Sequence, residues 1–305
     1  MNTSGHTNGS EHTPVLYRQA LEWLAIRPDG IYVDATFGAG GHTRGILEHC
    51  TRGWVIAFDA DPAAIDRANA LTASLENSTT RFTFVHANFR ELDRQLGALG
   101  VEQVDGVLFD LGVSSMQFHE IERGFSLQHR APLDMRMNPQ SGRSAYDVLT
   151  HASERELADI FFYYGQERAA RRIAPTIVQR REAGTLPSTT TDFAAMVSGM
   201  LQRSGHRERI HPATRVFQAL RIAVNDELDA LREGLTGAIS RLRGAGRVVT
   251  ISFHSLEDRI VKTTFREDDR LDVLTRKPVI PDEAEIIENP RARSAKLRAA
   301  LRKVN

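Results

Sequence analysis

Residues 34–43 of the chain read DATFGAGGHT, a glycine-rich turn at the end of the short β-rich run 30–35. A helical pattern follows at 43–49, so the stretch predicts a strand, a tight loop and a helix in succession. Gly38, Gly40 and Gly41 leave the loop backbone open to a ligand, and the helix that follows offers free N–H groups. A dinucleotide fingerprint requires a third glycine where Thr43 stands, so the loop favours an S-adenosylmethionine site.

Further strands and helices alternate downstream of this loop. Apolar, β-rich runs at 54–59, 81–86 and 104–110 predict three more strands, and 62–75 predicts a helix that begins at a proline. Strands separated by helices of this length indicate a parallel sheet covered on both faces. The fold class is therefore α/β, a Rossmann-like, doubly wound sheet.

The ends of the predicted strands carry polar and aromatic residues at the edge where such sheets bind ligands. Asp59 ends the second strand, 21 residues beyond Gly38, and its carboxylate can accept both hydroxyls of a ribose. Phe89 follows the third strand and could lie against an adenine face or simply fill the core. Asp110 ends the fourth strand. The pattern favours an adenosine ligand over a free phosphate.

The rest of the chain divides into a helical insertion and a return to the sheet. Residues 120–214 show helical patterns at 157–164, 167–181 and 192–201 and no convincing strand. A long helical region at 213–242 precedes the next strand, 247–253. We therefore predict a disordered N-terminus (1–11), a discontinuous α/β domain that contains the glycine loop (12–119 and 215–305) and an all-helical insertion (120–214).

Seven strings run in order along nearly the whole chain and resemble those of one family. They are residues 12–16 (HTPVL), 34–43 (DATFGAGGHT), 110–115 (DLGVSS), 132–137 (PLDMRM), 211–215 (HPATR), 252–259 (SFHSLEDR) and 289–298 (NPRARSAKLR). Together they resemble the bacterial small-subunit ribosomal RNA cytosine N4-methyltransferases, the RsmH or MraW family.

The resemblance implies an enzyme that methylates the exocyclic N4 of a decoding-centre cytosine in 16S ribosomal RNA. Its donor is S-adenosylmethionine and its substrate is RNA within the small ribosomal subunit. By motif position, the cofactor contacts fall on Gly40, Gly41, His42, Asp59, Phe89, Asp110 and Gln117. Of these, His42 and Gln117 are implied by the resemblance alone.

Methyl transfer to an amino nitrogen requires positioning of two reactants and no covalent nucleophile. Methylation at cytosine C5 would need a thiolate, and Cys50, the single cysteine, follows the first helix and points away from the strand ends. An acceptor for an N–H of the amine would help the nitrogen to attack. The candidates are Asp110, our tentative catalytic residue, and the carbonyls of Leu111 and Gly112.

Charge is distributed unevenly along the sequence although the total is zero, with 39 basic and 39 acidic residues. Residues 1–119 are acidic, whereas 289–305 carry six basic residues and no acidic one, which reads as a solvated basic tail able to contact phosphate. In the insertion, Arg168, Arg171, Arg172, Arg180 and Arg181 could follow an RNA backbone or form a solvated face. Phe37, Phe118 and Phe125 are candidates to stack on the target base.

Composition and motifs exclude several other classes. The chain has no apolar run long enough to span a membrane and no histidine or cysteine array of zinc type, so we expect a cytoplasmic protein without a metal. The composition is compatible with a homodimer. Two alternatives remain open at this point: an NAD-dependent oxidoreductase, which Thr43 disfavours, and a non-catalytic RNA-binding assembly factor.

Overall fold

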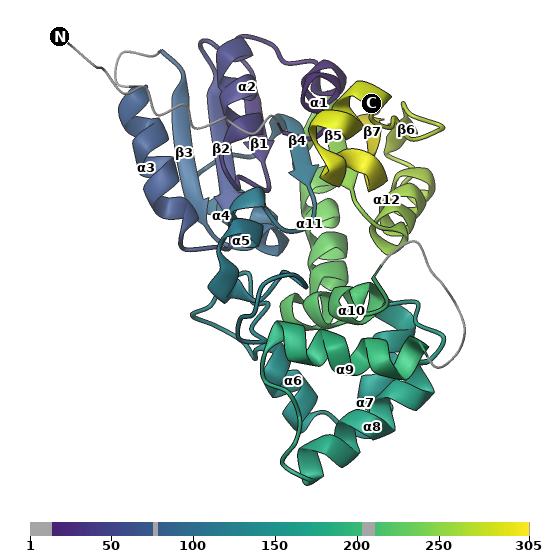
Figure 1. Cartoon of the computed structure of the whole chain (residues 1–305). Coiled ribbons are helices and arrows are strands. Elements are labelled where there is room, and N and C mark those ends of the chain that lie inside the picture. Colours follow the sequence, from purple (N-terminus) through teal and green to yellow (C-terminus); the bar gives the residue numbers. More distant parts are fainter. Residues whose placement is uncertain (1–13, 76–78, 203–210, 305) are drawn as a thin grey trace, which may run out of the picture.

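The computed structural model describes residues 14–75, 79–202 and 211–304, and its centre is one sheet of seven strands (Figure 1). The strands lie in the order β3-β2-β1-β4-β5-β7-β6. Their bounds are β1 Ile31–Asp34, β2 Trp54–Asp59, β3 Arg81–His86, β4 Val104–Asp110, β5 Leu242–Ser252, β6 Leu271–Val273 and β7 Lys296–Arg302. Strands β1 to β5 run parallel, and β7 pairs antiparallel with both β5 and β6.

The antiparallel direction of β7 determines where the preceding segment lies. Ser252, the last residue of β5, pairs with Lys296, the first residue of β7. The short 3-10 helix η4 (Pro290–Ser294) directly precedes β7, so it lies at the same edge as the carboxyl ends of β1 to β5. The predicted site edge therefore receives a segment from the end of the chain.

Helices cover both faces of the sheet, as the alternation of strands and helices predicts. One face packs against α1 (Tyr17–Leu24), α2 (Gly41–His49) and α3 (Ala64–Ser74). The other packs against α4 (Leu92–Ala98), α11 (Glu227–Arg241) and α12 (Ser255–Glu267). Strand β4 is buried along its first six residues, as expected for a strand covered on both sides.

A separate helical lobe lies beside the carboxyl edge of the sheet (Figure 1). It contains α6 (Ala145–His151), α7 (Glu154–Asp159), the π-helix η3 (Ile160–Tyr164), α8 (Ala170–Glu182), α9 (Thr190–Gln202) and α10 (Thr214–Asn225). These helices share a hydrophobic core of their own, to which α10 contributes Val216, Phe217 and Leu220. The domain boundary at residue 214 stays a prediction, and this packing favours a boundary after α10.

The fold class and the first four predicted strands are confirmed. The predicted helical region 213–242 divides into α10 and α11 at Asp226, which has a left-handed backbone with φ of 51°. The prediction of a solvated basic tail is wrong. Residues 296–302 form a strand inside the sheet, and Leu297, Ala299 and Ala300 are buried in the core. The charge pattern of this segment does not reveal these apolar positions. The predicted disordered N-terminus, residues 1–11, lies outside the described residues.

Candidate cofactor and active site

The carboxyl ends of β1, β2 and β4 bring the glycine loop, Asp59 and Asp110 to one edge of the sheet. Adjacent pairing of these strands places the ends close together: Asp34 of β1 pairs with Ala57 of β2 and Leu108 of β4. Open α/β sheets bind ligands at this edge, where the strand order reverses between β1 and β4. The structure therefore brings the glycine loop, Asp59 and Asp110 together at the edge where open α/β sheets bind ligands.

The glycine loop adopts a backbone that requires glycine at two positions. Gly38 has φ of 53° and Gly40 has φ of 81°, both in the left-handed region. At Gly41, the first residue of α2, a β-carbon would lie only 2.4 Å from Cγ of Pro14. The chain before α1 therefore packs directly against the start of α2, and a side chain on Gly41 would displace it.

Asp59 holds the loop in place from the end of β2. Its Oδ2 accepts the N–H of Gly38 at 2.8 Å, and its Oδ1 accepts the N–H of Asp61 at 2.9 Å. Burial raises the pKa of Asp59 from 3.8 to about 6, although both backbone N–H groups oppose the shift. Each oxygen keeps a second lone pair, so the carboxylate can also accept hydroxyl donors from a ligand.

Beneath the loop, a buried polar cluster links α2 to the ends of β1 and β4. Asp34 is fully buried and accepts the hydroxyl of Thr43 at 2.6 Å. His42 is also buried, and its Nε2 lies 3.5 Å from Oδ2 of Asp110. Burial lowers the pKa of His42, but Asp110 and Asp34 outweigh burial and raise it overall. Asp110 and Asp34 thus make the His42 ring a stronger base than an isolated imidazole.

Gln117 lies at this edge too, but its side chain is engaged with protein. Its carbonyl accepts the N–H of Ser114 at 3.0 Å, and its amide donates to Asp61 at 3.0 Å. Asp61 also binds Arg123 at 2.8 Å and is almost fully buried. Sequence reasoning missed Asp61, and the signal was the second acid of Asp59-Ala60-Asp61 directly after a strand.

The predicted aromatic contacts differ in their surroundings. Phe89 stands edge-on to Phe109 at 5.6 Å between ring centres and packs against Gly234 of α11. Its contact with adenine stays a prediction. Phe37 and Phe125 are buried at 3% and 8% exposure, which makes them core residues and poor candidates to stack on a base.

Asp110, at the end of β4, has a carboxylate oxygen that no described residue engages. Its side chain is 25% exposed, and its Oδ1 has no hydrogen-bond partner among the described residues. A covered acceptor without a donor costs free energy, and the torsion that turns an aspartate carboxylate is soft. A ligand that brings an N–H or O–H donor to this edge would therefore satisfy Oδ1 after a small rotation. The acceptor oxygens of Asp59 and Asp110 fit the hydroxyl donors of an adenosyl cofactor and the N–H donors of an amine substrate.

The predicted charged groups of the insertion separate into two kinds. Asp134 and Arg136 pair with each other at 2.6 Å, and Asp134 lines a cavity of about 450 Å³ within the insertion. Arg181 donates to backbone carbonyls of α6 and of Ala152. By contrast, the remaining predicted arginines are exposed: Arg168, Arg171, Arg172 and Arg180. Only these four are free of such a structural role.

One further cluster has the residue types of a metal site. Glu227, His254 and Glu257 place ligand atoms within 4.8 Å of one another. Arg221 binds both oxygens of Glu227 at 2.8 Å, and His254 Nε2 lies 3.2 Å from Glu257. Because Arg221 and His254 already engage the carboxylates of Glu227 and Glu257, the cluster serves as a structural link between α10, α11 and α12. The absence of a metal stays a prediction. No described helix is long and apolar enough to cross a membrane.

Three features are together typical of S-adenosylmethionine-dependent methyltransferases. They are a parallel sheet with an antiparallel β7 inserted between β5 and β6, a glycine loop after β1 and an acid at the end of β2. A family model described as the MraW methylase family matches residues 9–303. The chain therefore belongs to the MraW methylase family.

Relatives and solved structures carry corresponding names. A protein of Thermomicrobium roseum called ribosomal RNA small subunit methyltransferase H is 50% identical over 95% of this chain and 93% of its own length. A protein of the same name from Geobacter sulfurreducens is 49% identical over 95% and 98%. A putative methyltransferase of Streptococcus mutans, solved in complex with SAH, has a TM-score of 0.46 at 11% identity over 93% of this chain and 96% of that one. The family match and the identities of 50% and 49% show that the chain is an S-adenosylmethionine-dependent methyltransferase.

Proposed function

We propose that the protein transfers a methyl group from S-adenosylmethionine to the exocyclic N4 amine of a decoding-centre cytosine in 16S ribosomal RNA, within the small ribosomal subunit. The names of the relatives support small-subunit ribosomal RNA as the substrate. The observation that carries the choice of an amino nitrogen is the unpartnered Oδ1 of Asp110 at the end of β4.

When bound, the cofactor would supply a methyl group on its sulfonium. The amine nitrogen would form a bond to the methyl carbon in line as the carbon–sulfur bond breaks, and S-adenosylhomocysteine would be the leaving group. The Gly38–Gly41 loop and Asp59 would bind the adenosyl and ribose parts, and Gly40 and Gly41 would contribute through the backbone at the start of α2. His42, beside Asp110, and Gln117, bonded to Asp61, would lie next to the same ligand. The assignments of the glycines and Asp59 rest on their positions at the strand ends, and those of His42 and Gln117 rest on the family resemblance.

Asp110 would act on the substrate amine. The nitrogen lone pair of cytosine N4 is conjugated with the ring, and an acceptor for one N–H favours the pyramidal, nucleophilic form. Asp110 is held for this task by its own backbone, which donates from N–H to the hydroxyl of Thr36 at 2.7 Å. The carbonyls of Leu111 and Gly112 are the alternative acceptors at the same strand end.

The position of the only cysteine supports nitrogen over carbon as the target. Cys50 is buried, and its thiol donates to the carbonyl of Gly30 at 3.3 Å. Gly30 precedes β1, so Cys50 lies at the edge of the sheet opposite to Asp110. A thiolate attack on cytosine C6, which methylation at C5 requires, therefore has no nucleophile at the site.

The test is nucleoside analysis of undermethylated small subunits after incubation with the protein and labelled S-adenosylmethionine. We expect N4-methylcytidine, and 5-methylcytidine or a methylated adenosine would overturn the proposal. Asp110→Asn should lower kcat by roughly 100-fold, as for loss of a proton acceptor. Cofactor affinity, measured separately, should change far less. Asp66→Asn, at an exposed position of α3, is the matched control.

A further inference from the structure

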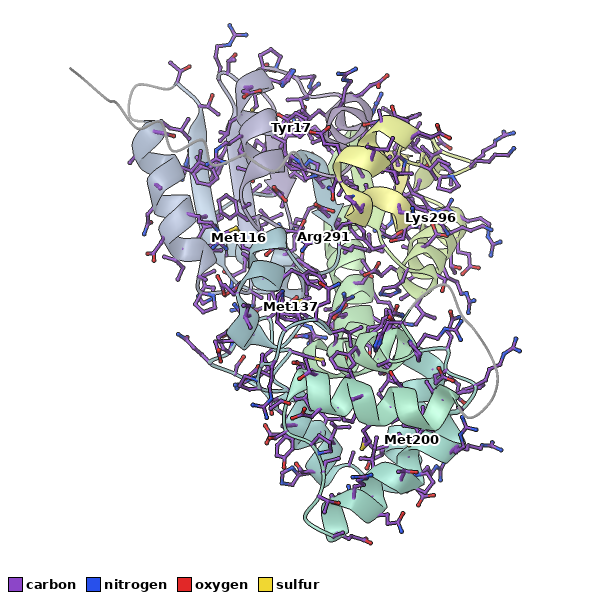
Figure 2. The ribbon with its side chains drawn as sticks, viewed as in Figure 1. Tyr17, Met116, Met137, Met200, Arg291 and Lys296 are labelled. Atoms are coloured by element: carbon purple, nitrogen blue, oxygen red, sulfur yellow. The ribbon has the colours of Figure 1, made fainter. Side chains whose placement is uncertain are left out.

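Arg291 lies at the site edge in a position that neither the fold nor the cofactor contacts explain. It belongs to η4, and its guanidinium lies over the ring of Phe118 with 4.6 Å from Cζ to the ring centre. Phe118 belongs to α5 (Ser115–His119), the helix directly after the β4 loop. Figure 2 shows Arg291 between Met116 of α5 and Lys296 of β7. Two distant parts of the chain therefore meet here.

The backbone around Arg291 is fixed. The side chain of Asn289 accepts the N–H of Arg291, and Pro290 begins the short helix. Ala292 and Ala295 are buried against the sheet at 0% and 1% exposure. Arg291 thus extends from a rigid support, and little conformational freedom is lost when it meets a ligand.

The guanidinium has no carboxylate partner among the described residues. Burial lowers the pKa of Arg291, and no acidic neighbour offsets that shift. Arg291 is exposed, whereas three arginines with less exposed side chains are paired: Arg123 binds Asp61, Arg221 binds Glu227, and Arg298 binds Asp258. A guanidinium stacked on a ring keeps its in-plane N–H donors directed outward, which is the geometry that binds a phosphate in bidentate fashion.

A cavity of about 300 Å³ adjoins this segment. It is lined by Phe253, His254 and Ser255 at the end of β5 and by residues 293–296, with Ile280, Pro281 and Ile286 opposite. Arg293 is exposed and, in the described part of the chain, has no ion-pair partner. The surface next to Arg291 therefore combines a second free cation with a hollow that can take a nucleotide.

We propose that Arg291, stacked on Phe118, forms a binding subsite for a backbone phosphate of the RNA strand beside the target nucleotide. This inference rests on the proposed function. Neighbouring strands lie about 4.8 Å apart, so β7 is roughly 10 Å from β4 and roughly 20 Å from β2. The backbone of Arg291 therefore lies on the side of Asp110 away from Asp59, and its side chain extends towards α5. We infer that the RNA strand beside the target nucleotide follows this side. The cofactor carboxylate is the competing anion, and the test separates the two.

The experiment measures binding of undermethylated small subunits over a series of salt concentrations, together with the Kd for S-adenosylmethionine. For Arg291→Ala we expect about tenfold weaker subunit binding. Each phosphate contact to a single strand contributes roughly 0.7 to the slope of log Kd against log salt, and the slope should fall by that amount. The cofactor Kd should stay within twofold. Arg52→Ala, exposed at the opposite edge of the sheet, is the matched control and should change neither quantity.

Two further variants separate the charge from the stacked geometry. Arg291→Lys should keep the salt slope and lose part of the affinity, because lysine binds phosphate as a point charge. Phe118→Leu should weaken binding less than Arg291→Ala, and the double variant should be no weaker than Arg291→Ala alone. The proposal is overturned if Arg291→Ala behaves as Arg52→Ala does, or if it weakens cofactor binding as much as subunit binding. Methylation of another nucleotide by the unaltered protein would refute the proposed function. The difference in subunit binding between Arg291→Ala and Arg52→Ala would still test the phosphate subsite.

Discussion

Two parts of the same sheet edge treat their polar groups in opposite ways. At the ends of β1 and β2, Asp34 and Asp59 are acidic, largely buried and bonded to neighbouring backbone or hydroxyl groups. At the start of β7, Arg291 and Arg293 are basic and have no carboxylate partner among the described residues. The first part is prearranged for a small ligand with neutral hydroxyl groups and a cationic sulfonium. The second part leaves guanidinium donors free to bind a polyanion.

The basic segment 289–305 contains a paired arginine as well as unpaired ones, and this difference gives the largest effect that we predict. Arg298 is 8% exposed and binds Asp258 at 2.7 Å. Burial opposes the shift, but Arg298 holds the pKa of Asp258 below its ordinary value. Removal of Arg298 leaves Asp258 with Lys296 alone, 3.5 Å away. Arg298→Ala should therefore lower the free energy of unfolding by roughly 2–3 kcal/mol, as for loss of a hydrogen bond to a charged group.

The measurement is denaturant unfolding of Arg298→Ala beside Arg293→Ala. The second variant removes an exposed arginine of the same segment and should stay within about 0.5 kcal/mol of the unaltered protein. Equal stability losses for the two variants would show that the segment does not divide into structural and free arginines.

The next largest effect is expected at the acidic side. Asp59→Ala removes the acceptor of the Gly38 N–H and the predicted acceptor of the ribose hydroxyls. A hydrogen bond to a charged group contributes about 1.5–3 kcal/mol, so cofactor affinity should fall by roughly 10- to 100-fold. Binding of small subunits in the absence of cofactor should be unaffected, the reverse of the result for Arg291→Ala. Calorimetric titration with S-adenosylmethionine measures the first quantity, and loss of both affinities would contradict the separation.

The acidic side could be predicted from the sequence because it is local. The loop, Asp59 and Asp110 each follow a strand whose apolar pattern is evident, and parallel pairing brings strand ends together whatever else the chain does. The partners of Gln117 could not be predicted, since its contact with Asp61 depends on the path of the chain after β4.

The basic side could not be predicted for a similar reason. Charge suggested a solvated tail, whereas the alternation of Leu297 and Ala299 with polar residues was too short to indicate a strand. Once β7 is known to be antiparallel, the place of Arg291 follows. Its contact with Phe118 joins two segments whose proximity only the sheet order reveals.

The smallest effect we predict is a dependence of cofactor affinity on pH that the basic side should not share. The pKa of Asp59 is raised by burial to about 6, so the ligand-free protein is less stable once pH rises through that value and the carboxylate ionises. Hydroxyl donors from the ribose bind the ionised form, so affinity should fall as pH is lowered from 7 to 5, by about tenfold at most. Asp59→Asn cannot titrate and should show weaker but flat affinity over this range. Subunit binding through Arg291 should show no step near pH 6, because a guanidinium stays charged there. A step of equal size in Asp59→Asn would assign the titration to another group at the edge, such as His42, and would remove Asp59 from the ribose contact.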